Sequence, residues 1–188
     1  HNGDLKRTLV DTAMAMLLKG GSQFTLREVA RRAGVSHTAP YKHFPDKAAL
    51  LEELSLIGFD RLRETLAGAL SAQPASLRST MVAMAERYMS FAGDNPGLYR
   101  LMLGSGAHDT PRVHLTERAL SALDVLTGVL ERGQAEGLLR QYNVRGQAAA
   151  CWALMHGMAL LSMDGLLLPE KVGPRPLPRP QGPDIHPV

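Results

Sequence analysis

Residues 24–50 read FTLREVARRAGVSHTAPYKHFPDKAAL, and this stretch decides how the N-terminal part of the chain folds. Thr25 and Glu28 have the spacing of a capping box, in which each side chain bonds the backbone amide of the other residue at a helix start. We therefore expect a short helix from here to Ala33, and Gly34 supplies a sharp turn after it.

A second short helix is expected after this turn, capped by Ser36 and reaching about His43. Pro40 lacks an amide hydrogen and must lie very near the helix start. It costs one intrahelical hydrogen bond if Ser36 is the cap, and none if His37 is. Two short helices joined by a glycine turn form a helix-turn-helix pattern, whose second helix enters the major groove of DNA.

The side chains left exposed on this pattern are mostly hydrogen-bond donors, which suit phosphate oxygens and base edges. We expect Lys47, at a helix start, to anchor a phosphate, and His37 and Thr38 to read bases. A solvated basic face on an ordinary helical bundle is the plainer alternative. The candidate DNA-binding residues are Thr25, Arg27, Ser36, His37, Thr38, Tyr41, Lys42, His43 and Lys47. The residues expected to pack the unit are Leu26, Val29, Ala30, Ala33, Val35, Tyr41 and Phe44.

Elsewhere, apolar residues recur at helical spacing, and no alternating β-branched stretch predicts a strand. Helices are expected at about 4–19, 46–70 with Asp46 as its cap, 76–92, 98–103, 111–137 and 144–168. The chain is thus predicted to be all-α. A three-helix helix-turn-helix domain over 1–50 is followed by a larger helical domain over 51–168 and an extended tail over 169–188, which holds seven prolines.

The charge is unevenly distributed along the 188 residues. Residues 1–50 hold eight Lys and Arg against four Asp and Glu, a net charge of +4, whereas residues 51–168 carry ten against twelve, or −2. The basic N-terminal part could therefore meet an acidic polymer. Cys151 is the only cysteine, so no internal disulfide can form, and no signal or membrane-spanning segment is evident. We expect a soluble, cytoplasmic protein.

Motifs for catalysis, cofactors or metals are not evident. The sequence holds no phosphate loop, nucleophile elbow or zinc-peptidase pattern. His108 and His114 lie six residues apart with Asp109 between them, but no further metal ligand is suggested. We expect neither an enzyme nor a bound cofactor or metal.

Residues 5–54 resemble the DNA-binding domain of the TetR (tetracycline-repressor-like) family of bacterial transcription regulators. The shared features are the opening threonine, Val-Ala followed by Ala-Gly-Val-Ser, and Tyr-Lys-His-Phe followed by Lys-x-x-Leu. The chain departs from the family at residues 37–40, His-Thr-Ala-Pro, where many members carry a glycine and no proline.

Two later segments resemble members with a so-called WHG C-terminal domain, namely residues 95–102 and the Trp-x-x-x-His-Gly run over 152–157. The resemblance implies an all-helical ligand-binding domain that dimerises through its last two long helices around a cavity. We expect a repressor that a ligand releases from a near-palindromic operator. Trp152, Tyr88 and several methionines lie in apolar helices with few charges, so a small apolar or aromatic effector fits better than a sugar or a nucleotide. Tentative ligand-binding residues are Tyr88, Met102, Trp152, Met155 and His156.

Alternatives remain at each of these points. A methionine stripe is more often ordinary core, and His156 could instead bond a backbone carbonyl. The last long helix is apolar nearly all round, which suits contact with its own domain on one side and a partner subunit on the other, or a central helix in a monomer. Other functions compatible with the sequence are a ligand-free operator or nucleoid binder, and a helical enzyme or carrier that does not bind DNA.

Overall fold

The computed structural model describes residues 2–71, 76–107 and 110–173, and all regular structure within these ranges is helical. The predicted all-α fold is therefore confirmed. In chain order the helices are α1 (Asn2–Gly20), α2 (Leu26–Ala33), η1 (Ala39–Lys42), α3 (Lys47–Ser71), α4 (Leu77–Asp94), α5 (Pro96–Leu103), η3 (Pro111–Leu115), α6 (Glu117–Ala135), α7 (Val144–Met163) and α8 (Pro169–Val172), of which η1 and η3 are 3-10 helices. None of the helices in these ranges is long and apolar enough to cross a membrane.

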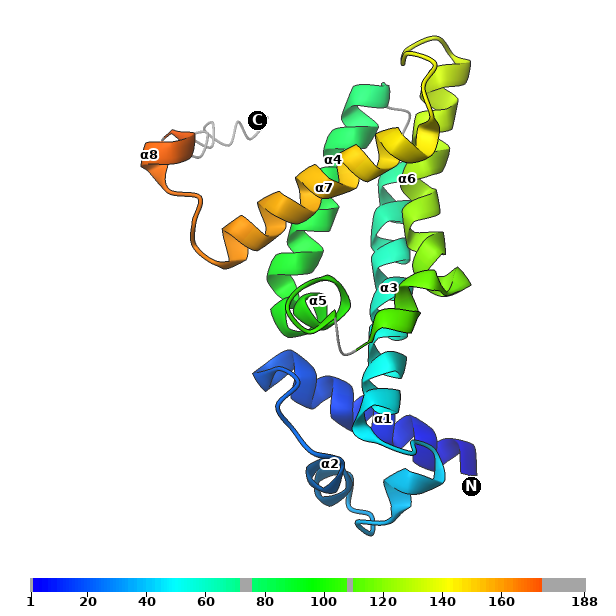
Figure 1. Cartoon of the computed structure of the whole chain (residues 1–188), viewed down its shortest axis with the longest axis vertical. Coiled ribbons are helices and arrows are strands. Elements are labelled where there is room, and N and C mark those ends of the chain that lie inside the picture. Colours follow the sequence, from blue (N-terminus) through cyan, green and yellow to red (C-terminus); the bar gives the residue numbers. More distant parts are fainter. Residues whose placement is uncertain (1, 72–75, 108–109, 174–188) are drawn as a thin grey trace, which may run out of the picture.

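The headpiece, which we define as residues 2–50, lies at one end of the molecule (Figure 1). The predicted capping box is present, since the Thr25 amide donates to Glu28 Oε2 at 2.9 Å and the Glu28 amide donates to Thr25 Oγ1 at 3.2 Å. Gly34 closes α2 with a φ of 71°, a left-handed conformation that favours glycine. The start of α3 is capped as expected, because Asp46 Oδ1 accepts the Ala49 amide at 2.8 Å.

The second motif helix differs from the prediction. In place of an α-helix capped by Ser36 or His37, the chain forms the 3-10 helix η1 after Thr38, which makes no side-chain capping bond. Pro40 explains the difference, because it has no amide hydrogen to donate to the Ser36 carbonyl one turn earlier. The Ser36 carbonyl instead accepts the Ala39 amide at 3.0 Å, and the Tyr41 amide bonds the Thr38 carbonyl at 3.2 Å in the next turn.

Helix α3 joins the headpiece to the larger body and packs against α4, α5 and α6, while α7 crosses α4 and α6 (Figure 1). The expected domain boundary after residue 50 falls inside this helix. Leu50 and Leu51 are both buried, and one apolar core runs from the headpiece into the body. The two parts therefore share α3 rather than a linker.

The helix predicted over 111–137 is split in two. Residues Pro111–Leu115 form η3, and α6 begins only after Thr116. The Thr116 hydroxyl donates to the Val113 carbonyl at 2.6 Å and accepts the Ala119 amide at 3.3 Å. Because the Thr116 backbone is extended, with a ψ of 152°, it interrupts the helix at the point where its side chain caps the next one.

The last long helix ends at Met163 rather than at Leu168. Gly165 has a φ of 68°, and the Leu166 amide bonds the Leu161 carbonyl at 2.8 Å, which turns the chain out of α7. The short helix α8 follows and stands apart from the body in Figure 1, so the start of the predicted extended tail is helical. Residues 174–188 of that tail, like 108–109, lie outside the described residues.

Candidate DNA-binding surface and ligand cavity

Most of the candidate DNA-binding side chains are exposed on the headpiece. They are Thr25, Arg27, Ser36, His37, Thr38, Tyr41 and Lys42. Tyr41 is 58% exposed, so its predicted role in packing the headpiece is wrong and its ring is available to a partner. The Ser36 and Thr38 hydroxyls lie 3.2 Å apart in the turn before η1 and present two adjustable hydrogen-bonding groups.

The other two candidates are engaged in the headpiece itself. Lys47 Nζ donates to the Ser22 carbonyl at 2.5 Å and lies 5.3 Å from the centre of the Phe24 ring. These two contacts connect the start of α3 to the segment before α2. His43 is half-buried, and its Nε2 is buried with no hydrogen-bond partner among the described residues. A contact from either residue to DNA stays a prediction.

A further cation, Lys6, was missed by the sequence reasoning. It is exposed on α1, and its Nζ lies 5.8 Å from the centre of the Phe44 ring, just after η1. Lys6 and Phe44 are far apart in sequence, and only the packing of α1 against the motif brings this charge beside η1. The motif alone held no signal for it.

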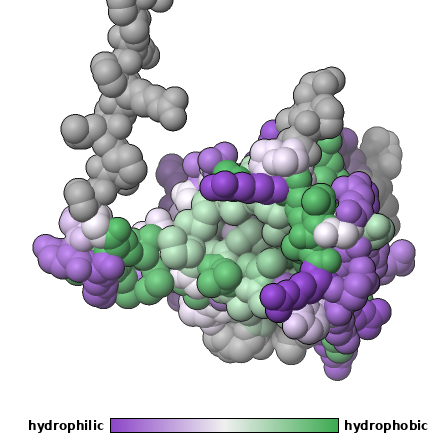
Figure 2. All heavy atoms as spheres, turned by 90° about the horizontal axis from the view of Figure 1, so that it is seen from above, coloured by the Kyte–Doolittle hydropathy of each residue, from purple (hydrophilic) through white to green (hydrophobic). Residues whose placement is uncertain are grey.

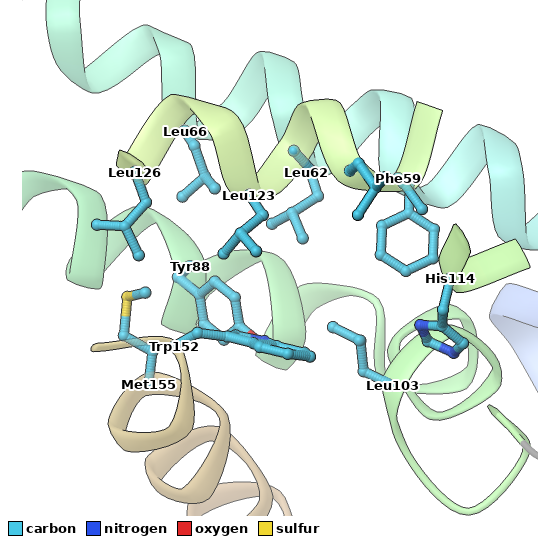
Figure 3. A pocket seen from close by; sticks show the side chains of 13 residues that line it. Phe59, Leu62, Leu66, Tyr88, Leu103, His114, Leu123, Leu126, Trp152 and Met155 are labelled. Atoms are coloured by element: carbon cyan, nitrogen blue, oxygen red, sulfur yellow. The ribbon is translucent and has the colours of Figure 1, made fainter. Parts of the chain in front are cut away.

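An apolar cavity of about 210 Å³ lies in the larger body, between α3, α4, α6 and α7 (Figure 3). Phe59, Leu62 and Leu66 of α3 and Leu123 and Leu126 of α6 form much of its wall. Such a cavity suits an apolar molecule, because ligand sites are mostly apolar with a few placed polar groups.

Three of the five tentative ligand residues line this cavity, namely Tyr88, Trp152 and Met155. Met102 does not. It is fully buried against α3, where a Cβ on Gly58 would lie 2.3 Å from the Met102 sulfur. His156 is also absent from the wall, and its Nδ1 lies 2.7 Å from the Tyr99 hydroxyl rather than bonding a backbone carbonyl.

His114 and the α3 and α6 residues of the wall were missed as ligand-binding candidates. Helix periodicity marks the apolar faces of α3 and α6 but does not say where these faces separate. His114 attracted notice only as half of a metal pair with His108, which lies outside the described residues.

A chain of four side chains connects the cavity wall to α5. Trp152 Nε1 donates to the Tyr88 hydroxyl at 3.2 Å, and the Tyr88 and Tyr99 hydroxyls lie 2.7 Å apart. Tyr99 in turn pairs with His156 at 2.7 Å. Trp152 and His156 are four residues apart on α7, a spacing that places both on one helix face toward the two tyrosines.

Burial keeps the hydrogen-bonded side chains of this group uncharged. It raises the pKa of the Tyr88 and Tyr99 hydroxyls and lowers the pKa of the His156 imidazole, so all three groups are uncharged near neutral pH. When Nδ1 of neutral His156 accepts from Tyr99, Tyr99 accepts from Tyr88 and Tyr88 accepts from Trp152. Each group is then satisfied in one consistent direction.

The comparisons with known proteins agree with this architecture. Residues 9–54 match the family described as bacterial regulatory proteins of the tetR family, and residues 81–175 match the tetracyclin repressor-like C-terminal domain. The chain belongs to the TetR family. Among curated relatives, the nucleoid occlusion factor SlmA of Vibrio vulnificus (strain YJ016) is 31% identical over 102 residues, covering 53% of this chain and 52% of SlmA. The chain thus spans about half the length of the curated relatives it matches.

Solved structures share the fold over most of the chain. A Rhodococcus sp. RHA1 protein of unknown function is 33% identical with a TM-score of 0.73, covering 87% of this chain and 84% of the other. A tetR-family regulatory protein from Rhodococcus RHA1 shares 19% identity with a TM-score of 0.62 and 83% coverage of each chain. FadR of Bacillus subtilis in complex with stearoyl-CoA shares 16% identity, with a TM-score of 0.67, and covers 87% and 90%. The last two similarities bear on the fold alone.

In this TetR-family chain, α5 contacts both candidate regions, the headpiece and the cavity wall. At its N-terminal end a Cβ on Gly97 would lie 2.4 Å from the Leu17 carbonyl oxygen of α1, so glycine permits a close approach to the headpiece. Two residues later, Tyr99 joins the hydrogen-bond chain to the cavity wall. Arg100 Nη2 then bonds Asp164 at the end of α7 at 2.5 Å. The same two turns of helix therefore contact the headpiece, the cavity wall and α7.

Proposed function

We propose that this protein is a ligand-responsive repressor, a homodimer that binds a near-palindromic DNA operator and releases it when a small apolar molecule occupies the cavity. The observation that carries the proposal is the combination of an exposed, donor-rich headpiece and an apolar cavity, which α5 and α3 connect within one core. The site of action is the bacterial cytoplasm, where the chromosome lies.

The headpiece supports binding to DNA. Its seven exposed candidates are mostly donors, and the net charge of +4 over residues 1–50 favours contact with phosphates. We assign base reading to His37 and Thr38 and phosphate contact to Lys42, which is exposed at the end of η1. Lys47 is a weaker phosphate candidate, because contact with DNA would compete with its bond to Ser22.

The outer face of α7 supports a homodimer. Leu154, Met158 and Leu161 are 72%, 45% and 40% exposed, and their spacing places them on one stripe of the helix with Ala150. Viewed from above, green and pale-green surface extends from the segment before α8 across the middle of the molecule (Figure 2). An apolar stripe on the outer side of a helix already packed on its inner side suits a second copy of the chain.

The link through α5 supports release by a ligand. A ligand can shift a two-state equilibrium only by binding the two states unequally. A molecule that separates α4 from α7 in the cavity would strain the bonds of Tyr88 to Trp152 and Tyr99, and Tyr99 belongs to the helix whose Gly97 rests on α1. We propose that this path changes the separation of the two headpieces in the dimer.

The experiment that tests the proposal measures the binding of the purified chain to its own upstream DNA and to shuffled DNA of equal length, by gel retardation at several salt concentrations. We expect a clear preference for the upstream DNA and a steep loss of affinity with salt. Equal affinity for both DNAs at moderate salt would reject a specific operator.

A second candidate function is a DNA binder without an effector. The similarity to SlmA, whose name describes nucleoid occlusion, favours this alternative. The cavity distinguishes the two functions, because a binder without an effector would keep its DNA affinity when apolar compounds occupy the cavity.

A further inference from the structure

We propose that His114 recognises a single neutral polar group of the effector at one end of the cavity. The effector is then a small neutral molecule with an apolar body and one carbonyl or hydroxyl group. This inference rests on the proposed function and names the ligand class of the same site.

The polar groups of the cavity wall are few, and most are already used. Besides the thioether of Met155, the described lining residues offer hydrogen-bonding side-chain atoms only on Tyr88, Trp152 and His114. The Trp152 N–H donates to the Tyr88 hydroxyl, and the Tyr88 hydroxyl is paired with Tyr99. The imidazole of His114 makes no hydrogen bond within the described part of the chain, so it is the group left for a ligand.

His114 is held in place by packing rather than by hydrogen bonds. It belongs to η3, and its ring meets Phe59 edge-on, with ring centres 5.7 Å apart and planes at 81°. Figure 3 shows the imidazole at the end of the cavity near Phe59 and Leu103, with Trp152 and Met155 toward the other end. A ligand that fills the cavity therefore meets apolar walls along its length and the imidazole at one end.

The charges around the cavity favour a neutral group. Lysine, arginine and carboxylate side chains are missing from the described lining residues. Among the charged residues next to a lining residue in sequence, Asp60 and Arg118 bond each other at 2.5 Å, and the others, Arg61, Arg63, Arg87 and Asp124, are exposed. A carboxylate or ammonium of the ligand would thus be buried without a full counter-charge, which is costly. A neutral imidazole donates through one nitrogen and accepts through the other, which suits a carbonyl or a hydroxyl.

The test uses three compounds with the same heavy-atom skeleton: cyclohexyl methyl ketone, cyclohexanecarboxylate and isopropylcyclohexane. Each is titrated into the full chain while the fluorescence of Trp152, the only tryptophan, is followed. We expect the ketone to bind about three- to tenfold more tightly than the hydrocarbon, the effect of one neutral hydrogen bond. We expect the carboxylate to bind most weakly.

The variant His114→Phe keeps a ring against Phe59 and removes both nitrogens. It should lose the preference for the ketone and keep its affinity for the hydrocarbon, while Tyr142→Phe, at a residue that is 63% exposed and outside the cavity wall, should leave all three affinities unchanged. If His114→Phe unfolds, as judged by circular dichroism, His114→Gln and His114→Leu replace it, and only the glutamine variant should retain the preference.

Two results overturn the inference and leave the proposed function intact. One is equal binding of ketone and hydrocarbon to the wild type, or an unchanged preference in His114→Phe, with DNA still released. The other is tightest binding of the carboxylate, which would mean that a cation recognises the ligand. Failure of all three compounds to bind would overturn this ligand class. Binding without any change in DNA affinity would instead contradict the proposed function.

Discussion

Tyr99→Phe removes one oxygen atom from the centre of the hydrogen-bond chain and leaves the packing of the ring intact. Tyr99 is fully buried, and its hydroxyl lies 2.7 Å from both the Tyr88 hydroxyl and His156 Nδ1. Two neutral hydrogen bonds are lost, each worth about 1 kcal/mol. The Tyr88 hydroxyl, in a side chain only 2% exposed, also loses one of its two partners. We therefore expect a loss of about 2–3 kcal/mol in the free energy of unfolding.

Urea unfolding followed by circular dichroism measures this loss. Tyr142→Phe is the matched control, because Tyr142 is 63% exposed and its hydroxyl makes no hydrogen bond within the described residues. The control should stay within about 0.5 kcal/mol of the wild type, as is usual for surface substitutions. If Tyr99→Phe also stayed within that margin, the hydrogen bonds from Trp152 to His156 would not hold α5 to the cavity wall.

Three further predictions concern DNA, assembly and pH. In binding titrations at several salt concentrations, Lys42→Ala should weaken binding to all DNA sequences and lower the slope of log affinity against log salt concentration by about 1. Thr38→Ala should instead change the preference among operator variants by about 1–3 kcal/mol per lost base contact. The reverse pattern would exchange the two roles. Leu154→Glu puts a charge into the proposed interface, so light scattering should show a folded monomer in place of the dimer. Leu115→Glu, at a residue that is 83% exposed, should leave the dimer intact. A wild-type chain that is monomeric at micromolar concentration would contradict the proposed dimer. Burial lowers the pKa of His156 in the folded state, so its contribution to stability is present above its unfolded pKa near 6.5 and is lost as the pH falls through the folded pKa. His156→Gln should therefore flatten the decline of the free energy of unfolding below pH 6.5. An equally steep decline in the variant would mean that other groups cause it.

Local signals predicted the start of the motif well. The capping box of Thr25 and Glu28 and the turn at Gly34 involve neighbouring residues only, so the sequence contains all the information that they need. The prediction for the second motif helix was wrong because an α-helix capped by Ser36 needs an amide hydrogen at residue 40 for the Ser36 carbonyl, and Pro40 has none. The sequence identified this missing donor but did not determine whether an α-helix would tolerate its loss.

The ligand cavity was predictable only in part. Trp152, Met155 and Tyr88 drew attention as large, adaptable side chains in apolar helices, and all three line the cavity. The opposite wall depends on how α3 and α6 separate, which local periodicity does not determine. Met102 has the same chemistry as Met155, yet Gly58 opens a place for it in the core between α3 and α5. His114 reaches the cavity only because Thr116 breaks the predicted long helix and leaves η3 beside Phe59.

The most direct test of the central claim is reciprocal linkage between the cavity and the operator. The neutral compound that binds most tightly by Trp152 fluorescence is added at saturation, and the dissociation constant for the upstream DNA is measured with and without it. Its own dissociation constant is then measured on the free and the DNA-bound protein. We expect the compound to weaken DNA binding and DNA to weaken binding of the compound by the same factor, because linkage is reciprocal. An operator affinity that stays unchanged while the cavity is occupied would contradict release by a ligand.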